Sequence, residues 1–156
     1  MFRRRVAGSA GIYIPESVLS EMIDHADDGL STGNEVMGLI IGTFYRDDRG
    51  QYAVADRLAT TDLIADPYSV RFDTNALDRM CDTMEIGDGE SIIGWYHSHL
   101  DLGCFMSPTD VSTQDRMFSG DCGFALVIDP VRKEMKVFDS TLGNPSPVDM
   151  IVMDSD

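Results

Sequence analysis

The chain is poor in lysine, in cysteine and in long apolar runs. Its only lysines are Lys133 and Lys136, and 12 Lys and Arg stand against 27 Asp and Glu, which gives a net charge of −15. Such a surface repels phosphate groups, so we expect no nucleic-acid partner. No apolar run approaches the roughly 18 residues that cross a bilayer, so we also expect no membrane partner.

The cysteine content indicates the redox compartment. The three cysteines, Cys81, Cys104 and Cys122, are an odd set without paired spacing. This is typical of a reduced, intracellular protein rather than of a disulfide-stabilised one. Residues 3–5 are arginines, as at the start of a signal peptide, but no apolar segment follows them. We therefore expect a cytoplasmic protein.

The 156 residues are enough for one domain with a substantial core, and 43% of them are hydrophobic. The patterning indicates an α/β fold in which a mixed central β-sheet is flanked by helices. We assign residues 1–143 to this domain and 144–156 to an acidic C-terminal tail, whose apolar run 148–153 is left open as a strand. The periodicity predicts strands at 11–14, 35–44, 52–63, 91–97, 123–129 and 134–138, helices at 15–26, 73–84 and 107–117, and polar loops at 27–34 and 62–70.

One segment, Gly94–Asp110, carries most of the functional signal. Side chains two positions apart on a strand face the same way, so His97 and His99 point to one side. Asp110 follows in the first turn of the helix predicted to start at Ser107, and the intervening loop can return it to the histidines. Three such ligands leave one position for water, as in a catalytic zinc site, although other divalent metals also accept this donor set.

Each of these residues also has a structural interpretation. Ser107 and Pro108 are a good helix start, with serine as N-cap and proline in the first position, and Asp110 lies near the positive end of the helix dipole. Capping and metal binding are compatible if one carboxylate oxygen binds the metal while the backbone orients the other. For His97 and His99 the structural alternative, two polar residues at a strand end, is weaker, because a His-x-His followed by an acid at a helix start is a specific conjunction.

A metal-dependent hydrolase also needs a base that takes the proton of the activated water. Glu35 is the best candidate, because it leads directly into the apolar segment 36–41, where an acid is not expected for packing. The alternative is an exposed acid at a strand edge.

These features together resemble a known family. Glu35, the segment Gly94–His99, and the pair Ser107 and Asp110 occur with the spacing of the JAMM metalloproteases, the catalytic branch of the MPN family. The resemblance extends over residues 12–138, and its motif is specific because all five functional positions are present.

The resemblance implies a role for each position. His97, His99 and Asp110 would bind one Zn²⁺ per chain, and Glu35 would hold and deprotonate the catalytic water. Ser107 would donate a hydrogen bond to the tetrahedral intermediate. The implied fold is like that of the cytidine deaminases. The implied activity is hydrolysis of the bond between the C-terminus of a ubiquitin-like modifier and a protein amine, with processing of small sulfur-carrier proteins as an alternative.

The chain departs from the family pattern in two places. Leu100 stands where the family usually has proline, which leaves the turn after the strand less constrained. Residues 129–133 connect two strands directly where members of large complexes carry an insertion, which favours a stand-alone microbial enzyme and allows a homodimer. The loop 62–70 lies where relatives grip the modifier, or else is an ordinary connection. Cys104 is expected to be a packed thiol rather than a ligand.

Two other functions fit less well. A non-catalytic MPN module that only binds partners typically lacks a ligand, and this chain lacks none. A deaminase is suggested by the fold alone, and the Pro-Cys-x-x-Cys ligands of that class are missing from the sequence.

Overall fold

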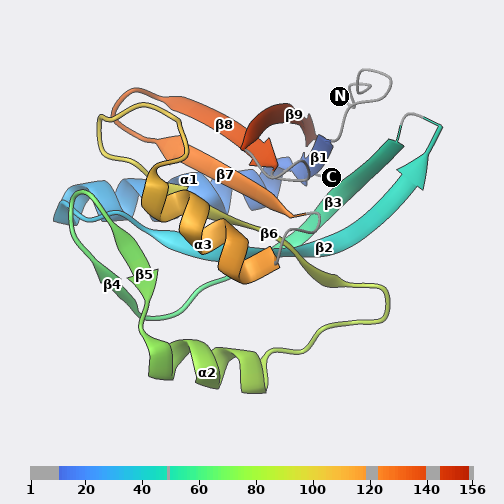
Figure 1. Cartoon of the computed structure of the whole chain (residues 1–156), viewed down its shortest axis with the longest axis horizontal. Helices are drawn as coiled ribbons and strands as arrows, with labels where there is room; N and C mark the ends of the chain where they lie inside the picture. Colours follow the sequence, from blue (N-terminus) through green and yellow to red (C-terminus); the bar gives the residue numbers. More distant parts are fainter. Residues whose placement is uncertain (1–10, 49, 119–122, 140–144, 155–156) are drawn as a thin grey trace.

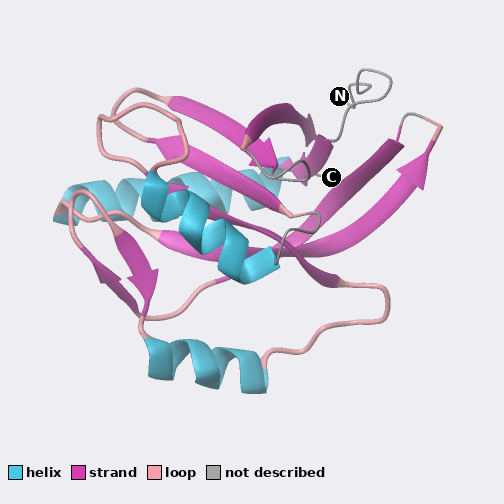
Figure 2. Ribbon diagram, in the orientation of Figure 1, coloured by secondary structure: helices cyan, strands magenta, loops and turns pink. Residues whose placement is uncertain are grey.

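The computed structural model describes residues 11–48, 50–118, 123–139 and 145–154 (Figures 1 and 2). It has the expected mixed α/β architecture. Its elements in chain order are β1 (Gly11–Pro15), α1 (Glu16–Thr32), β2 (Met37–Asp47), β3 (Gly50–Ala59), β4 (Leu63–Ala65), β5 (Val70–Phe72), α2 (Thr74–Thr83), β6 (Ser91–Ser98), α3 (Pro108–Phe118), β7 (Phe124–Asp129), β8 (Glu134–Asp139) and β9 (Ser146–Met153).

The main sheet closes on itself in the order β1-β3-β2-β6-β7-β8-β9. The pairs β1–β3, β1–β9 and β6–β7 are parallel and the others are antiparallel. The C-terminal apolar run therefore packs as strand β9, between β1 and β8. Figure 1 shows α1 and α3 on opposite sides of the strands, with α2 and the β4–β5 pair to one side.

Each side of the sheet has its own apolar cluster. Under α1, Val18, Met22 and Ala26 pack against inward-facing residues of β1, β2, β6 and β7. On the other side, Trp95 packs with residues of β2, α2 and α3, among them Phe118. Because side chains alternate along a strand, the neighbours Trp95 and Tyr96 lie in different clusters. Trp95 lies on the same side of the sheet as His97.

Helix α1 is longer than the sequence suggested, because residues 27–32, expected in a loop, continue it. The aspartates there lie on the exposed face and do not interrupt the helix. Gly33 ends it in the left-handed conformation, with φ of 74°. Gly29 is buried where a Cβ would come within 2.5 Å of Val36 Cγ1, so glycine is needed for close packing at this point.

The segment 62–70, predicted as a loop, contains β4 and the start of β5, which form a small antiparallel pair. The prediction was wrong because Asp66 makes a tight turn. Its carboxylate accepts the backbone N–H groups of Tyr68 at 2.8 Å and Ser69 at 2.9 Å. The Asp66 carbonyl accepts the N–H of Glu35 at 3.0 Å, so this small hairpin also positions the segment before β2.

No helix within the described ranges is long and apolar enough to span a membrane.

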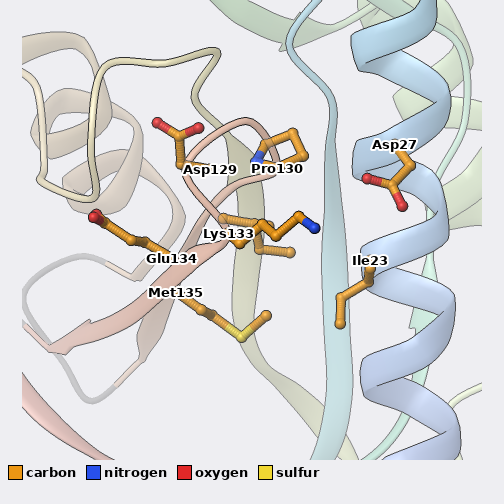
Figure 3. A pocket seen from close by; sticks show the side chains of 8 residues that line it. Ile23, Asp27, Asp129, Pro130, Lys133, Glu134 and Met135 are labelled. Carbon is orange, nitrogen blue, oxygen red and sulfur yellow. The ribbon is translucent and has the colours of Figure 1, made fainter.

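The surface between α1 and the β7–β8 turn is hollowed into a cavity of about 300 Å³ (Figure 3). Ile23 and Asp27 line it from α1, and Pro130, Lys133 and Met135 line it from the hairpin.

Candidate metal centre

Strand β6 and helix α3 bring the three predicted ligands together. His97 lies near the end of β6, His99 directly follows it, and Asp110 lies in the first turn of α3. The Asp110 Oδ2 is 3.0 Å from His97 Nε2 and 3.1 Å from His99 Nε2. All three residues are buried, and their ligand atoms lie within 4.8 Å of one another. They therefore form a group that could hold a metal ion.

The donor set fits zinc. Bonds of 2.0–2.1 Å in a tetrahedral site place neighbouring ligand atoms roughly 3.3 Å apart, close to the two distances above. His97 is fully buried, and neither of its ring nitrogens has a hydrogen-bond partner among the described residues. Its Nε2 lies near Asp110 without hydrogen-bond geometry. Because a buried imidazole without partners is costly, this side chain fits a metal ligand better than a packed core residue.

The environment favours the protonation states that a metal requires at His97 and Asp110, whereas at His99 it favours an additional proton. Burial lowers the pKa of His97, which keeps the ring neutral. Burial alone would raise the pKa of Asp110, but His97 and His99 hold it well below its usual range, so the carboxylate stays ionised. Burial also opposes protonation of His99, yet its bonds to Asp110 and to the Gly103 carbonyl raise its pKa above the usual value. A bound cation would displace the proton from Nε2 of the protonated His99 ring.

Glu35 is buried rather than exposed, which rules out the strand-edge interpretation. Only 3% of it is accessible, and Oε2 has no hydrogen-bond partner in the described part of the chain. Burial raises the pKa of Glu35 to about 8, with His99 acting in the opposite direction and Asp110 adding to the increase. A desolvated carboxylate whose pKa is near neutral and whose charge interacts with the ligand group is a candidate general base.

Ser98, which the sequence reasoning did not single out, connects Glu35 to the histidine strand. Its Oγ accepts the Val36 N–H at 2.8 Å, and its own N–H donates to the Val36 carbonyl at 2.9 Å. Ser98 is fully buried between the two histidines in sequence. Met37 pairs with His97 in the sheet, and the bonds between Val36 and Ser98 continue this pairing by one residue. They place Glu35, the residue before Val36, beside the end of β6.

Ser107 caps helix α3. Its N–H donates to Asp110 Oδ2 at 2.9 Å, and its Oγ accepts the Asp110 N–H at 3.1 Å. The structural interpretation of the helix start is therefore confirmed. The same oxygen, Oδ2, lies near both histidines and accepts the Ser107 N–H, whereas the sequence interpretation gave these two roles to different oxygens. Since the Ser107 Oγ acts as an acceptor here, its proton stays available for a donor role.

Trp95 and Gln114 also support the site and were missed in the sequence. The Trp95 ring stacks on His97 with centroids 4.4 Å apart and planes inclined by 14°. Its indole N–H donates to Gln114 Oε1, and Gln114 Nε2 donates to the Gly123 carbonyl at 3.0 Å. Gln114 lies one helical turn after Asp110 on the same face of α3, and that spacing was the available signal. Cys104 is a buried free thiol whose Sγ lies 3.5 Å from the Val127 carbonyl, outside the ligand group.

Comparison with known proteins gives a consistent result. Residues 8–119 match the family described as JAB1/Mov34/MPN/PAD-1 ubiquitin protease. The chain is 33% identical over 136 residues to the 26S proteasome non-ATPase regulatory subunit 14 of Caenorhabditis elegans, covering 82% of this chain and 40% of that protein. It is 33% identical over 153 residues to the 26S proteasome regulatory subunit rpn11 of Schizosaccharomyces pombe, covering 93% and 47%. It is 33% identical over 129 residues to the ubiquitin carboxyl-terminal hydrolase RPN11 of Saccharomyces cerevisiae, covering 78% and 39%.

The chain thus spans less than half the length of these curated relatives. The solution structure of a Desulfitobacterium hafniense protein superposes with a TM-score of 0.65 at 22% identity, covering 92% of this chain and 94% of that one. This likeness shows the shared fold.

Proposed function

Because the chain belongs to the JAB1/Mov34/MPN/PAD-1 ubiquitin protease family, we propose that it is a zinc-dependent isopeptidase. Its substrate class would be a ubiquitin-like modifier joined through its C-terminus to a protein amine. The observation that carries the proposal is the buried group of His97, His99 and Asp110 together with the buried Glu35, whose Oε2 has no hydrogen-bond partner among the described residues and whose charge interacts with His99 and Asp110. A module that only binds partners needs neither a metal-ligand group nor a desolvated base.

The residues divide the work as follows. His97, His99 and Asp110 hold the zinc, which when bound supplies Lewis acidity and lowers the pKa of water to about 7. Glu35 orients the attacking water, accepts its proton at Oε2 and delivers it to the departing amine. Its raised pKa suits it to both steps near neutral pH. The Ser107 hydroxyl donates to the oxygen that becomes negative in the tetrahedral intermediate.

The substrate assignment rests on the relatives. One of them is named a ubiquitin carboxyl-terminal hydrolase, and a small sulfur-carrier protein of the ubiquitin fold is the second substrate candidate. We also propose a cytoplasmic location, for which the free thiols of Cys81 and Cys104 are suited.

Zinc content and cleavage test the proposal together. We expect one zinc per chain after chelator-free purification and cleavage of at least one fusion in a panel of ubiquitin-like proteins, read by mass spectrometry of the new C-terminus. Glu35→Gln should keep the zinc and lose about 10²- to 10⁴-fold in rate. Glu134→Gln, at an exposed position of β8, is the matched control and should behave as wild type. Unchanged cleavage by Glu35→Gln would remove Glu35 as the base, and zinc binding without any cleavage would favour the non-catalytic module.

A further inference from the structure

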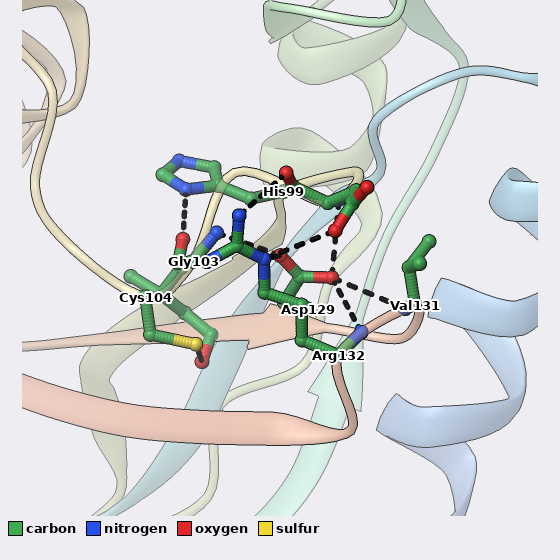
Figure 4. A network of polar contacts seen from close by, with 8 residues as sticks. His99, Gly103, Cys104, Asp129, Val131 and Arg132 are labelled. Atoms are coloured by element: carbon green, nitrogen blue, oxygen red, sulfur yellow. Dashed lines mark hydrogen bonds and ion pairs between the residues drawn. The ribbon is translucent and has the colours of Figure 1, made fainter.

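A third buried carboxylate, besides those of Glu35 and Asp110, lies near the metal centre and has no part in the proposed reaction. Asp129 ends β7 and is fully buried. Its Oδ1 accepts the N–H groups of Asp101, Val131 and Arg132, each at 3.1 Å. Its Oδ2 accepts the N–H of Gly103 at 2.8 Å. Figure 4 shows this carboxylate at the centre of the network, and Figure 3 shows it turned away from the cavity that Asp129 helps to line.

These contacts join two segments that are distant in sequence, the loop after β6 and the β7–β8 turn. The loop needs support, because Asp101 has a φ of 63° and Gly103 a φ of 86°, both in the left-handed region. It also begins with Leu100 and so lacks the rigidity of a proline at that position. On the protein surface, the Arg132 guanidinium also binds this loop. It donates to the Asp101 carboxylate at 3.0 Å and to the Asp101 backbone carbonyl at 3.1 Å.

The loop in turn holds a metal ligand. The Gly103 carbonyl lies 2.8 Å from His99 Nδ1. A carbonyl only accepts, so Nδ1 carries the proton and Nε2 is the nitrogen directed at Asp110 and the metal position. The His99 backbone N–H donates to the Ile128 carbonyl at 2.8 Å, which fixes the main chain of His99 against β7 next to Asp129.

We propose that Asp129 is a positioning residue of the metal centre, which holds Gly103 so that its carbonyl fixes the ring orientation and tautomer of His99. Two hydrogen bonds connect Asp129 to His99 through Gly103. The Gly103 N–H donates to the Asp129 carboxylate, and the Gly103 carbonyl accepts from His99 Nδ1. The proposal rests on the proposed zinc function.

Asp129→Asn tests the proposal with little change in volume. An amide retains one acceptor oxygen, but its NH₂ group cannot accept, so either Gly103 or the three other N–H groups lose their partner. We expect zinc affinity, measured by chelator competition, to fall about 10- to 100-fold. In the zinc-free protein, ¹⁵N NMR of the histidine ring should show a smaller fraction of the Nδ1–H form of His99. The Gly103 amide should also exchange faster with solvent.

Two controls separate positioning from general destabilisation. Ile12→Val removes a buried methyl group on β1, the strand farthest from β6 and β7 in the sheet order, and should lower Tm without changing zinc affinity or the His99 tautomer. Arg132→Ala removes the ion pairs of the half-exposed guanidinium with Asp101 at 3.0 Å and with Asp129 Oδ2 at 3.9 Å but keeps all four backbone N–H bonds to the Asp129 carboxylate. Zinc affinity should therefore fall much less than in Asp129→Asn.

The outcomes are distinguishable. Wild-type protein that binds no zinc contradicts the proposed function itself. Wild-type protein that binds zinc, together with an Asp129→Asn variant of equal affinity and unchanged His99 tautomer, overturns the positioning role alone. Should Asp129→Asn fail to fold, Gly103→Ala perturbs the same link from the loop side, because a Cβ there is strained at φ of 86°. It should weaken zinc binding likewise, and unaltered affinity in that variant would also overturn the proposal.

Discussion

Replacing Ser98 by alanine should destabilise the protein and slow catalysis while leaving the metal ligands in place. The hydroxyl is fully buried and accepts the Val36 N–H at 2.8 Å. Alanine leaves that N–H without a partner, and an unsatisfied buried donor costs about 1–3 kcal/mol. The second bond of the pair, from the Ser98 N–H to the Val36 carbonyl at 2.9 Å, is unaffected. At roughly 2–4 °C per kcal/mol for a chain of this size, Tm should fall by about 2–12 °C.

The catalytic effect follows from the position of Val36, directly after Glu35. Loss of the Ser98 anchor frees the segment that carries the proposed base, whereas β6 still holds His97 and the Ile128 carbonyl still holds the main chain of His99. A displacement of about 1 Å at a catalytic group reduces rates by as much as 10²-fold, so kcat should fall about 10- to 100-fold. Zinc affinity should stay within about twofold, because no ligand atom depends on this hydroxyl.

The assays are thermal unfolding, chelator competition and steady-state kinetics on one fusion substrate. Ser31→Ala is the matched control, because its hydroxyl donates to the Asp28 carbonyl on the exposed end of α1. A Ser98→Ala protein with wild-type Tm and kcat would refute the argument that this hydroxyl positions the base. A large loss of zinc would show instead that Ser98 supports the ligands.

Three further expectations concern the supporting residues. Burial would raise the pKa of Asp129, but the backbone N–H groups that its carboxylate accepts hold the pKa below its usual 3.8. The free energy of unfolding should therefore fall as pH drops below about 4, and Asp129→Asn should show a smaller fall in the same acid titration. Gly29→Ala should destabilise by about 1–3 kcal/mol in chemical denaturation despite better helix propensity, since its Cβ would overlap Val36; a more stable variant would contradict the packing argument. Gln114→Leu should cost about 1–3 kcal/mol by leaving the Trp95 indole N–H unpaired, and unchanged tryptophan fluorescence and Tm would argue against this.

The sequence predicted the long elements and the ligand group because their signals are local. A strand with histidines two positions apart and a helix beginning Ser-Pro are each specified within a few residues. The end of α1 was misplaced because Gly29 reads as a helix stop, whereas its role is close packing against Val36, which only the tertiary fold reveals. The β4–β5 hairpin was missed because each strand has only three residues, too few for periodicity to be visible.

The supporting side chains were harder to predict for a related reason. Ser98 and Asp129 act on backbone N–H groups 62 and 26 positions away, counted to Val36 and Gly103. Nothing in the neighbouring sequence marks such partners, since a serine or an aspartate near a strand end is equally consistent with a solvated turn. Only the pairing of β2 with β6 and of β6 with β7 brings these groups together.

The centre is therefore organised by short polar side chains that bind backbone rather than metal. Ser98 fixes the segment of the base, Ser107 fixes the helix start that carries Asp110, and Asp129 fixes the loop that orients His99. Serine and aspartate have few rotamers, so each bond to the backbone constrains its segment at a small entropic cost. Because these bonds involve no metal, we expect them to hold the three segments in the zinc-free protein as well. Such a protein would differ from structural zinc sites, where metal binding and folding are a single event.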